Sequence, residues 1–122
     1  MPTARFKPTG GPIEVAVSCQ PNRNGSYTIK LWEANQNVVV HEFVGNFINT
    51  DDDSFDLNMP SSAHAGRLVE ALIVVAVPAG VGPSTLKLTI SQDGQTLATD
   101  SGKVPPGSPG QLVDLFIDLV SA

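Results

Sequence analysis

The chain has 122 residues, 41% of them hydrophobic and 16% charged, and a formal net charge of −5. This length and composition fit one folded domain with a buried core and exclude a disordered chain. The acidic balance argues against a nucleic-acid partner, which needs clustered Lys and Arg, and against polybasic attachment to a membrane. The single cysteine, Cys19, excludes an intrachain disulfide, and the N-terminus lacks the apolar stretch of a secretory signal, so a cytoplasmic location is favoured.

The N-terminal residues 1–12 contain three prolines and two glycines and are expected to form an extended arm. Residues 13–122 are expected to form a single domain, because no internal repeat or second domain is visible. From Ile13 to Gln20 apolar and polar residues alternate, which is the pattern of a half-buried strand. Cys19 continues the apolar side of this strand, so we interpret it as a small buried side chain.

Eight strands are predicted along the chain, at spacings typical of a sandwich and with no convincing long helix. They cover 13–20, 27–33, 38–44, 55–59, 68–77, 85–91, a hairpin partner that follows Asp93-Gly94, and 112–120. The predicted fold is therefore all-β, a two-sheet antiparallel β-sandwich of immunoglobulin-like or jelly-roll type. Residues 101–111 are rich in Pro, Gly and Ser and are expected to form a loop.

The most apolar stretch is 68–77, in which Glu70 is the only charged residue. It is too short to span a bilayer as a helix, which takes about 20 residues. Its β-branched residues favour a strand, with a buried helix as the alternative. Both alternating sets are apolar, so both faces of the strand need a cover. If Leu68, Leu72 and Val74 face the core, then a loop, the N-terminal arm or another subunit must cover the other face.

A three-residue loop joins the second and third predicted strands and sets their register. It places Lys30 opposite Glu42 and Trp32 opposite Val40. Opposite charges that face each other across strands are stabilising, so the Lys30–Glu42 pair favours this register. These four residues then lie together on the face away from the core, unless a shift of one residue exchanges the two faces and buries Trp32.

The C-terminal half contains the clearest turn signal. Asp93-Gly94 predicts a two-residue hairpin turn that pairs Ile90 with Leu97. In the last strand Phe116 lies on the outward side, between two aspartates. The inward residues of that strand are Val113, Leu115, Ile117 and Leu119.

The densest group of acidic residues follows the third strand and contains the candidate metal ligands Asp51, Asp53 and Asp56. With Asn49 and Thr50 they offer several oxygen ligands, and calcium takes about six to eight such ligands. The spacing does not match the EF-hand loop, so a second loop would have to complete a calcium site. The alternative is a solvated charged turn that keeps the neighbouring apolar strands soluble.

The sequence offers little material for catalysis, and we predict that the protein is not an enzyme. Its histidines are His41 and His64, no G-x-S-x-G nucleophile motif is present, and no Cys/His set has the spacing of zinc ligands. No cofactor is expected, apart from calcium at the acidic residues.

The function that the sequence favours is contact, either with another protein or with a second copy of the chain. Exposed apolar surface is usually covered by a partner. The residues expected to make the contact are Trp32, Lys30, Val40, Glu42 and Phe116. The alternative is a lectin-like, carbohydrate-binding module that stacks a sugar ring on Trp32 and uses residues 49–56, with or without calcium.

Overall fold

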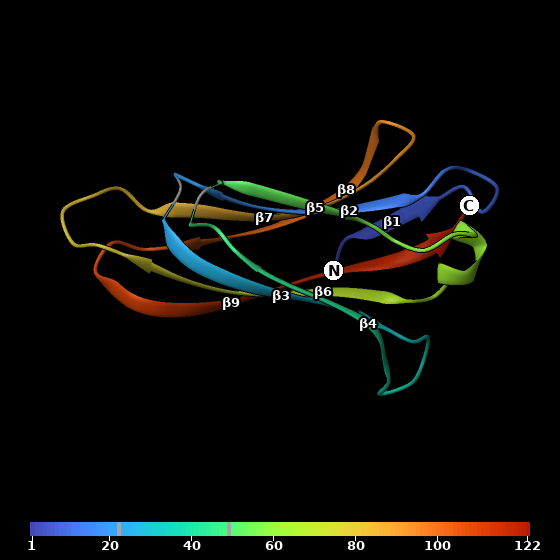
Figure 1. The fold of residues 1–122 in the computed structure, drawn as a ribbon, viewed down its shortest axis with the longest axis horizontal. Helices are drawn as coiled ribbons and strands as arrows, with labels where there is room; N and C mark the ends of the chain where they lie inside the picture. Colours follow the sequence, from blue (N-terminus) through green and yellow to red (C-terminus); the bar gives the residue numbers. More distant parts are fainter. Residues whose placement is uncertain (22, 49) are drawn as a thin grey trace.

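The computed structural model describes residues 1–21, 23–48 and 50–122. These ranges contain nine strands and one short 3-10 helix. The strands form two sheets that pack face to face, as Figure 1 shows. The prediction of a two-sheet β-sandwich is confirmed. Neighbouring strands pair antiparallel, except that the first strand pairs parallel with the last.

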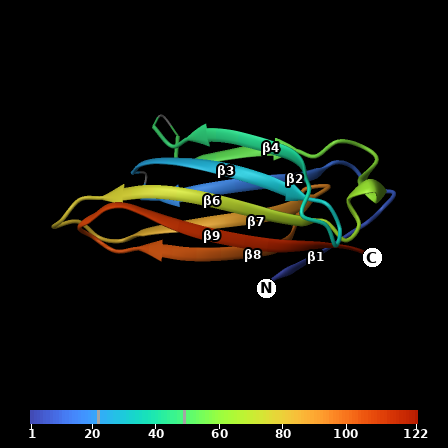
Figure 2. The same cartoon turned by 90° about the horizontal axis from the view of Figure 1, so that it is seen from below.

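Sheet A has the strand order β1-β9-β6-β3-β4, and sheet B has the order β5-β2-β7-β8. Figure 2 looks onto sheet A, whose strands β4, β3, β6 and β9 run side by side. The strands of sheet A are β1 (Thr3–Phe6), β3 (Asn24–Trp32), β4 (Val39–Asn46), β6 (Leu68–Val77) and β9 (Ser108–Ser121). The strands of sheet B are β2 (Ile13–Gln20), β5 (Asp52–Asp56), β7 (Ser84–Gln92) and β8 (Gln95–Val104), and the helix η1 is Ser61–His64.

Strand β6 forms from the most apolar stretch and lies at the centre of sheet A. Its core-facing residues are Val69, Ala71, Ile73, Val75 and Val77. Leu68, Leu72 and Val74 point the other way, so the assumption that they face the core is wrong. The reason is parity, because these residues share a face with Glu70 and a charged side chain is costly inside the core.

The expected N-terminal arm contains strand β1, which pairs with β9 and buries Ala4 and Phe6. The residues after β1 are held by the buried side chain of Gln92. Its Nε2 donates to the carbonyl oxygens of Lys7 and Gly11 at 2.9 and 3.0 Å, and its Oε1 accepts the Lys7 N–H at 2.8 Å. This buried amide therefore attaches the N-terminal segment to the turn end of the β7–β8 hairpin.

The predicted loop at 101–111 is wrong, because β8 extends to Val104 and β9 begins at Ser108. The turn between them is short, and Gly107 takes a positive φ of 81° there, which glycine adopts without strain. Pro105, Pro106 and Gly107 fall in this turn, and Pro109 and Gly110 fall at an irregularity in the β6–β9 pairing, where proline is tolerated. Gly102 lies within β8.

The β3–β4 hairpin has the predicted Lys30–Glu42 pair, but Trp32 lies opposite Val39 instead of Val40. A bulge between Leu31 and Trp32 leaves Val40 as the extra residue of β4. The predicted Trp32–Val40 pair is therefore wrong by one residue, since loop length alone does not reveal a bulge.

The hairpin turn at Asp93-Gly94 is confirmed, with φ values of 52° and 76° that suit a type I′ turn. The register beyond it differs from the prediction. Another bulge, between Ile90 and Ser91, places Ile90 opposite Ala98 instead of Leu97.

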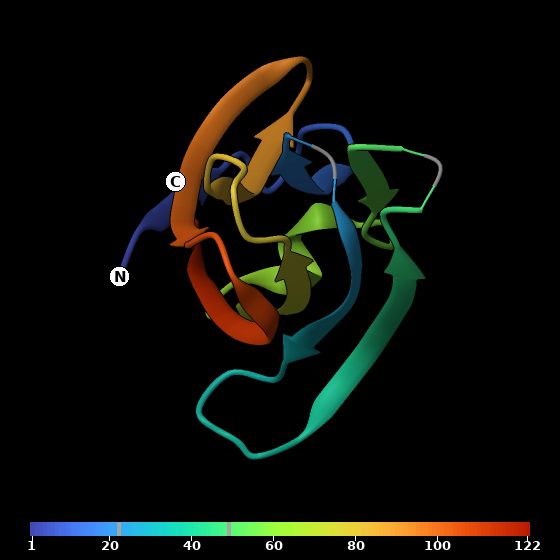
Figure 3. The same ribbon diagram turned by 90° about the vertical axis from the view of Figure 1, so that its left-hand side faces the viewer.

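One side of the sandwich is closed and the other has two free edges. On the closed side β8 packs against β9, where Asp100 Oδ2 accepts the N–H of Phe116 at 3.0 Å. Figure 3 shows β8 and β9 on this side and the edge strands β4 and β5 on the other. Between β4 and β5 the sandwich is filled by stacked rings, with the Phe43 and Phe55 centroids 4.5 Å apart.

Candidate contact surfaces

The outer face of sheet A is the surface that points away from sheet B. On it Phe116, Glu70, Lys30 and Glu42 occupy registered positions across β9, β6, β3 and β4. Trp32 lies on the same face, two residues beyond Lys30 along β3. The structure thus brings together four of the five residues expected to make a contact.

The fifth residue, Val40, lies apart from them. Because it is the bulged residue of β4, it lines a pocket on the open side of the sandwich and not the outer face. This separation could not be read from strand alternation, which assumes an uninterrupted ladder.

A groove of about 490 Å³ opens where the β3–β4 loop rises above the outer face of sheet A. Trp32, Leu68 and Phe116 supply apolar wall, and Glu70 and Asp118 supply carboxylates. The loop adds the polar side chains of Glu33, Asn35, Gln36 and Asn37. The volume of the groove lies in the usual range for small-ligand sites, roughly 300–1,000 Å³.

Glu70 lines this groove but was not among the residues predicted to make a contact. It is only 8% exposed, and its Oε1 accepts the indole N–H of Trp32 at 2.9 Å. The signal was present, because Glu70 is the lone charge in an apolar run, and a buried charge needs a partner.

A second carboxyl group lies beside Glu70. The pKa of Asp114 is raised to about 6, first by burial and then by the hydrogen bond and the negative charge of Glu70. Lys30 acts in the opposite direction, and its Nζ lies 5.8 Å from the centroid of the Trp32 ring. The negative charge of Glu70 therefore favours the protonated form of Asp114 on the outer face.

An ion pair forms the rim between the groove and the open side. Arg67 donates from Nε and Nη2 to the two oxygens of Glu33, at 3.1 and 2.9 Å. These hydrogen bonds, before any other cause, lower the pKa of Glu33 to about 2. The bidentate geometry fixes the first residue of the β3–β4 loop relative to the start of β6.

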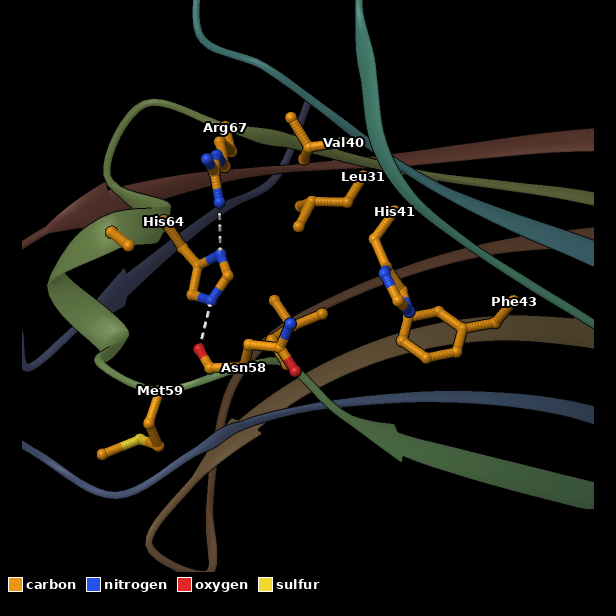
Figure 4. A pocket seen from close by; sticks show the side chains of 10 residues that line it. Leu31, Val40, His41, Phe43, Asn58, Met59, His64 and Arg67 are labelled. Atoms are coloured by element: carbon orange, nitrogen blue, oxygen red, sulfur yellow. Dashed lines mark hydrogen bonds between the residues drawn. The ribbon is translucent and has the colours of Figure 1, made fainter.

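The pocket on the open side, of about 200 Å³, is shown in Figure 4. Leu31, Val40 and Phe43 line it together with both histidines. The Arg67 guanidinium, which can only donate, lies 3.1 Å from His64 Nδ1. Nδ1 is therefore the acceptor, and Nε2 donates to the carbonyl oxygen of Asn58 at 2.6 Å. Both nitrogens of His64 are thus occupied in holding η1 to the segments that follow β5 and precede β6.

Cys19 is buried, in agreement with its interpretation as a core residue. Burial raises the pKa of its thiol, which disfavours the thiolate form that acts as a nucleophile.

The three candidate metal ligands do not converge. Asp53 accepts the hydroxyl hydrogen of Tyr27 at 2.6 Å, and Asp51 accepts from Gln20 Nε2 at 3.3 Å. Asp56 lies three residues beyond Asp53 along β5, so it points to the other face of the strand. Asn49 lies outside the described residues, and among the residues that are described no three His, Cys, Asp or Glu side chains are grouped to hold a metal.

The acidic residues also lie apart from Trp32. Asp52–Asp56 form an edge of sheet B, whereas Trp32 lies on the outer face of sheet A. In the predicted carbohydrate site made of Trp32 and residues 49–56, strand β5 therefore lies on a different sheet from Trp32.

The four edge strands differ in how well they are protected against pairing with another chain. Charged residues, short length and coverage are the usual protections. Strand β1 has four residues, β5 has five with three aspartates, and β8 packs against β9. Strand β4 has eight residues, and Glu42 is the only Asp, Glu, Lys or Arg among them.

Exposed apolar side chains gather at this unprotected edge. Val44 is 72% exposed, Ile48 just beyond the strand is 63% exposed, and Val38 and Val40 are also exposed. By contrast, most of the large apolar side chains of the other strands are buried. Strand β4 therefore combines free backbone groups with an apolar surface.

In the described ranges no helix is long and apolar enough to cross a membrane. Comparison with protein-family models, with curated proteins and with solved structures finds no match for this chain.

Proposed function

We propose that this chain is a non-catalytic binding domain that acts by protein–protein contact, and that its partner is a second copy joined edge to edge along β4. The observation that carries the proposal is the contrast between β4 and the other edges. Strand β4 is long and nearly uncharged, and exposed valines lie within the strand and next to it. Free strand edges of this kind pair readily with another strand.

The two copies would be related by a two-fold axis perpendicular to the sheet, which makes the new pair antiparallel. A register centred on Val44 places this valine against its own copy and Glu42 opposite Asn46. A register centred on Glu42 would instead place two carboxylates opposite each other, which is destabilising. The Val44-centred register uses the regular part of β4, beyond the bulge at Val40.

Burial of Val44 in both copies supplies part of the driving force. A fully buried valine side chain contributes on the order of 1.5 kcal/mol, and hydrogen bonds along the edge add to this. Joining the two copies would make one continuous sheet from two copies of the five-stranded sheet A.

The test is the mass in solution, measured by light scattering from micromolar to millimolar concentration. Pairing predicts a species of twice 12.8 kDa that forms with rising concentration. Val44→Lys should give a monomer, because it places a charge on the edge. The matched control is Val74→Lys, which adds the same charge at an exposed position of the central strand β6 and should leave the dimer intact.

Hydrogen exchange locates the contact independently. Amides of residues 42–46 should become slower to exchange at dimer-forming concentrations, while those of β5 should not change. A chain that stays monomeric at all concentrations rules out self-association. A dimer that survives Val44→Lys but is lost in Val74→Lys rules out the β4 edge and assigns the contact to the outer face.

A further inference from the structure

We propose that the groove on the outer face of sheet A binds an organic cation, an ammonium or guanidinium group, between the rings of Trp32 and Phe116 and the carboxylates of Glu70 and Asp118. Binding in this groove does not depend on pairing through β4. The argument rests on the charge balance of the groove, the burial of Glu70 and the nature of its walls.

The groove is lined by carboxylates and, among the described residues, by no Lys or Arg. The carboxylates are Glu33, Glu70 and Asp118. These three acids give the lining an excess of negative charge. Arg67 is bound to both oxygens of Glu33, so the excess lies on the β6–β9 side of the groove.

Glu70 carries this excess in a buried place. Its side chain lines the groove although the residue is only 8% exposed. One oxygen accepts the neutral indole N–H of Trp32, and among the described residues no ion pair joins Glu70 to Lys30. A buried carboxylate is stabilised by a cation, and a ligand can supply one here.

The walls of the groove suit such a ligand. Aromatic faces attract ammonium and guanidinium groups, and Trp is the most favourable ring for this contact. Lys30 already places its Nζ 5.8 Å from the centroid of the Trp32 ring. Phe116 stands across the sheet, on the β9 side of Glu70. An alkylammonium chain would thus contact rings along its length and carboxylates at its charged end.

Proton competition gives the binding a pH dependence. The charged groups of the strands that share this face are Glu70 on β6, Lys30 on β3, Glu42 on β4, the two aspartates on β9 and Arg5 on β1. A bound cation would compete with the proton of Asp114, whose pKa is raised to about 6 beside Glu70. Binding should therefore be weaker at pH 5 than at pH 7.5.

The experiment uses Trp32 as the reporter, because it is the only tryptophan of the chain. Butylammonium is titrated into the intact protein while the indole fluorescence and the indole N–H resonance are followed. Butanol, which has the same chain without the charge, is the matched ligand control. Saturable changes with butylammonium and none with butanol are expected.

Two variants connect the response to the groove. Asp118→Asn should weaken butylammonium binding by about tenfold, the usual size of the loss of one charge-assisted contact. Glu70→Gln should do the same and remove the pH dependence, with circular dichroism as the check on its fold. Glu42→Gln is the control, because Glu42 lies on the same face but outside the groove.

A tetralysine peptide distinguishes the two sources of the cation. Tighter binding of the peptide than of butylammonium identifies a lysine side chain of a protein, and equal binding identifies a small amine. The proposal is overturned if butanol binds as well as butylammonium, or if Asp118→Asn binds as the wild type does. It is also overturned if a neutral oligosaccharide saturates the Trp32 signal and butylammonium does not.

Discussion

The indole N–H of Trp32 donates to the carboxylate of Glu70 at 2.9 Å, and this hydrogen bond joins β3 to β6 on the outer face of sheet A. It holds a large aromatic ring beside a buried charge. The hydrogen bond fixes the ring and the carboxylate relative to each other, and both line the groove. The groove on this face depends on the pair.

Replacing Trp32 by Phe should therefore destabilise the fold. The substitution keeps an aromatic ring but leaves the buried Glu70 oxygen without its donor, at a cost of about 1–3 kcal/mol in the free energy of unfolding. Urea unfolding measures the change. In a Glu70→Leu background the same substitution should cost less, and equal costs in both backgrounds would show that the hydrogen bond contributes nothing.

Asp114→Asn should stabilise the protein at neutral pH but not in acid. The pKa of Asp114 is raised to about 6 in the folded protein, above its usual 3.8. A raised pKa means that the group favours folding while it is protonated, below pH 3.8, and that this contribution is lost as the pH rises through 6. The asparagine imitates the protonated acid at every pH.

The check is thermal unfolding between pH 4 and 8. The difference between Asp114→Asn and the wild type should be small at pH 4 and should grow as the pH passes 6. A difference that does not change with pH would contradict the raised pKa of Asp114.

Glu33→Gln should remove part of the acid sensitivity of the fold. The bidentate contact with Arg67 lowers the pKa of Glu33 to about 2 from its usual 4.5. Its contribution is therefore complete above pH 4.5 and is lost as the pH falls toward 2. Unfolding at several pH values in this range should show a shallower loss of stability for the variant. Glu14→Gln, an exposed change on sheet B, is the control and should follow the wild type.

Gly45→Ala should destabilise the protein strongly, although Gly45 lies in an edge strand. A Cβ at Gly45 would collide with the hydroxyl group and ring of Tyr27, which lies directly opposite on β3. Moving the ring would break its hydrogen bond to Asp53, so a cost of about 1–3 kcal/mol is expected, as for other overpacked sites. Gly82→Ala, where the new Cβ meets no atom within 4 Å, is the control.

His64 should be a neutral ring with its proton on Nε2. Arg67 can only donate, so Nδ1 must accept and Nε2 must carry the hydrogen that points at the Asn58 carbonyl. Nitrogen NMR of the imidazole distinguishes the two tautomers directly. In Arg67→Ala this preference should weaken, whereas a proton on Nδ1 in the wild type would contradict the arrangement around η1.

Much of the fold could be predicted from local sequence. Alternation predicted the strand of Ile13–Gln20 and the inward residues of the last strand, because the side-chain period of a strand is two wherever one face is buried. Asp93-Gly94 predicted its turn because that turn type requires positive φ at both residues. The opposition of Lys30 and Glu42 followed from loop length and charge.

The tertiary structure decided what depends on partners far apart in sequence. Two bulges moved Val40 and Leu97 out of their predicted pairs, since an extra residue in a ladder leaves no local signal. Glu70 meets Trp32 from a separation of 38 residues, a contact that exists only because β6 pairs with β3. The alternation of each strand could be seen in its own residues. The groove and the free edge depend instead on the order of the strands within the sheets.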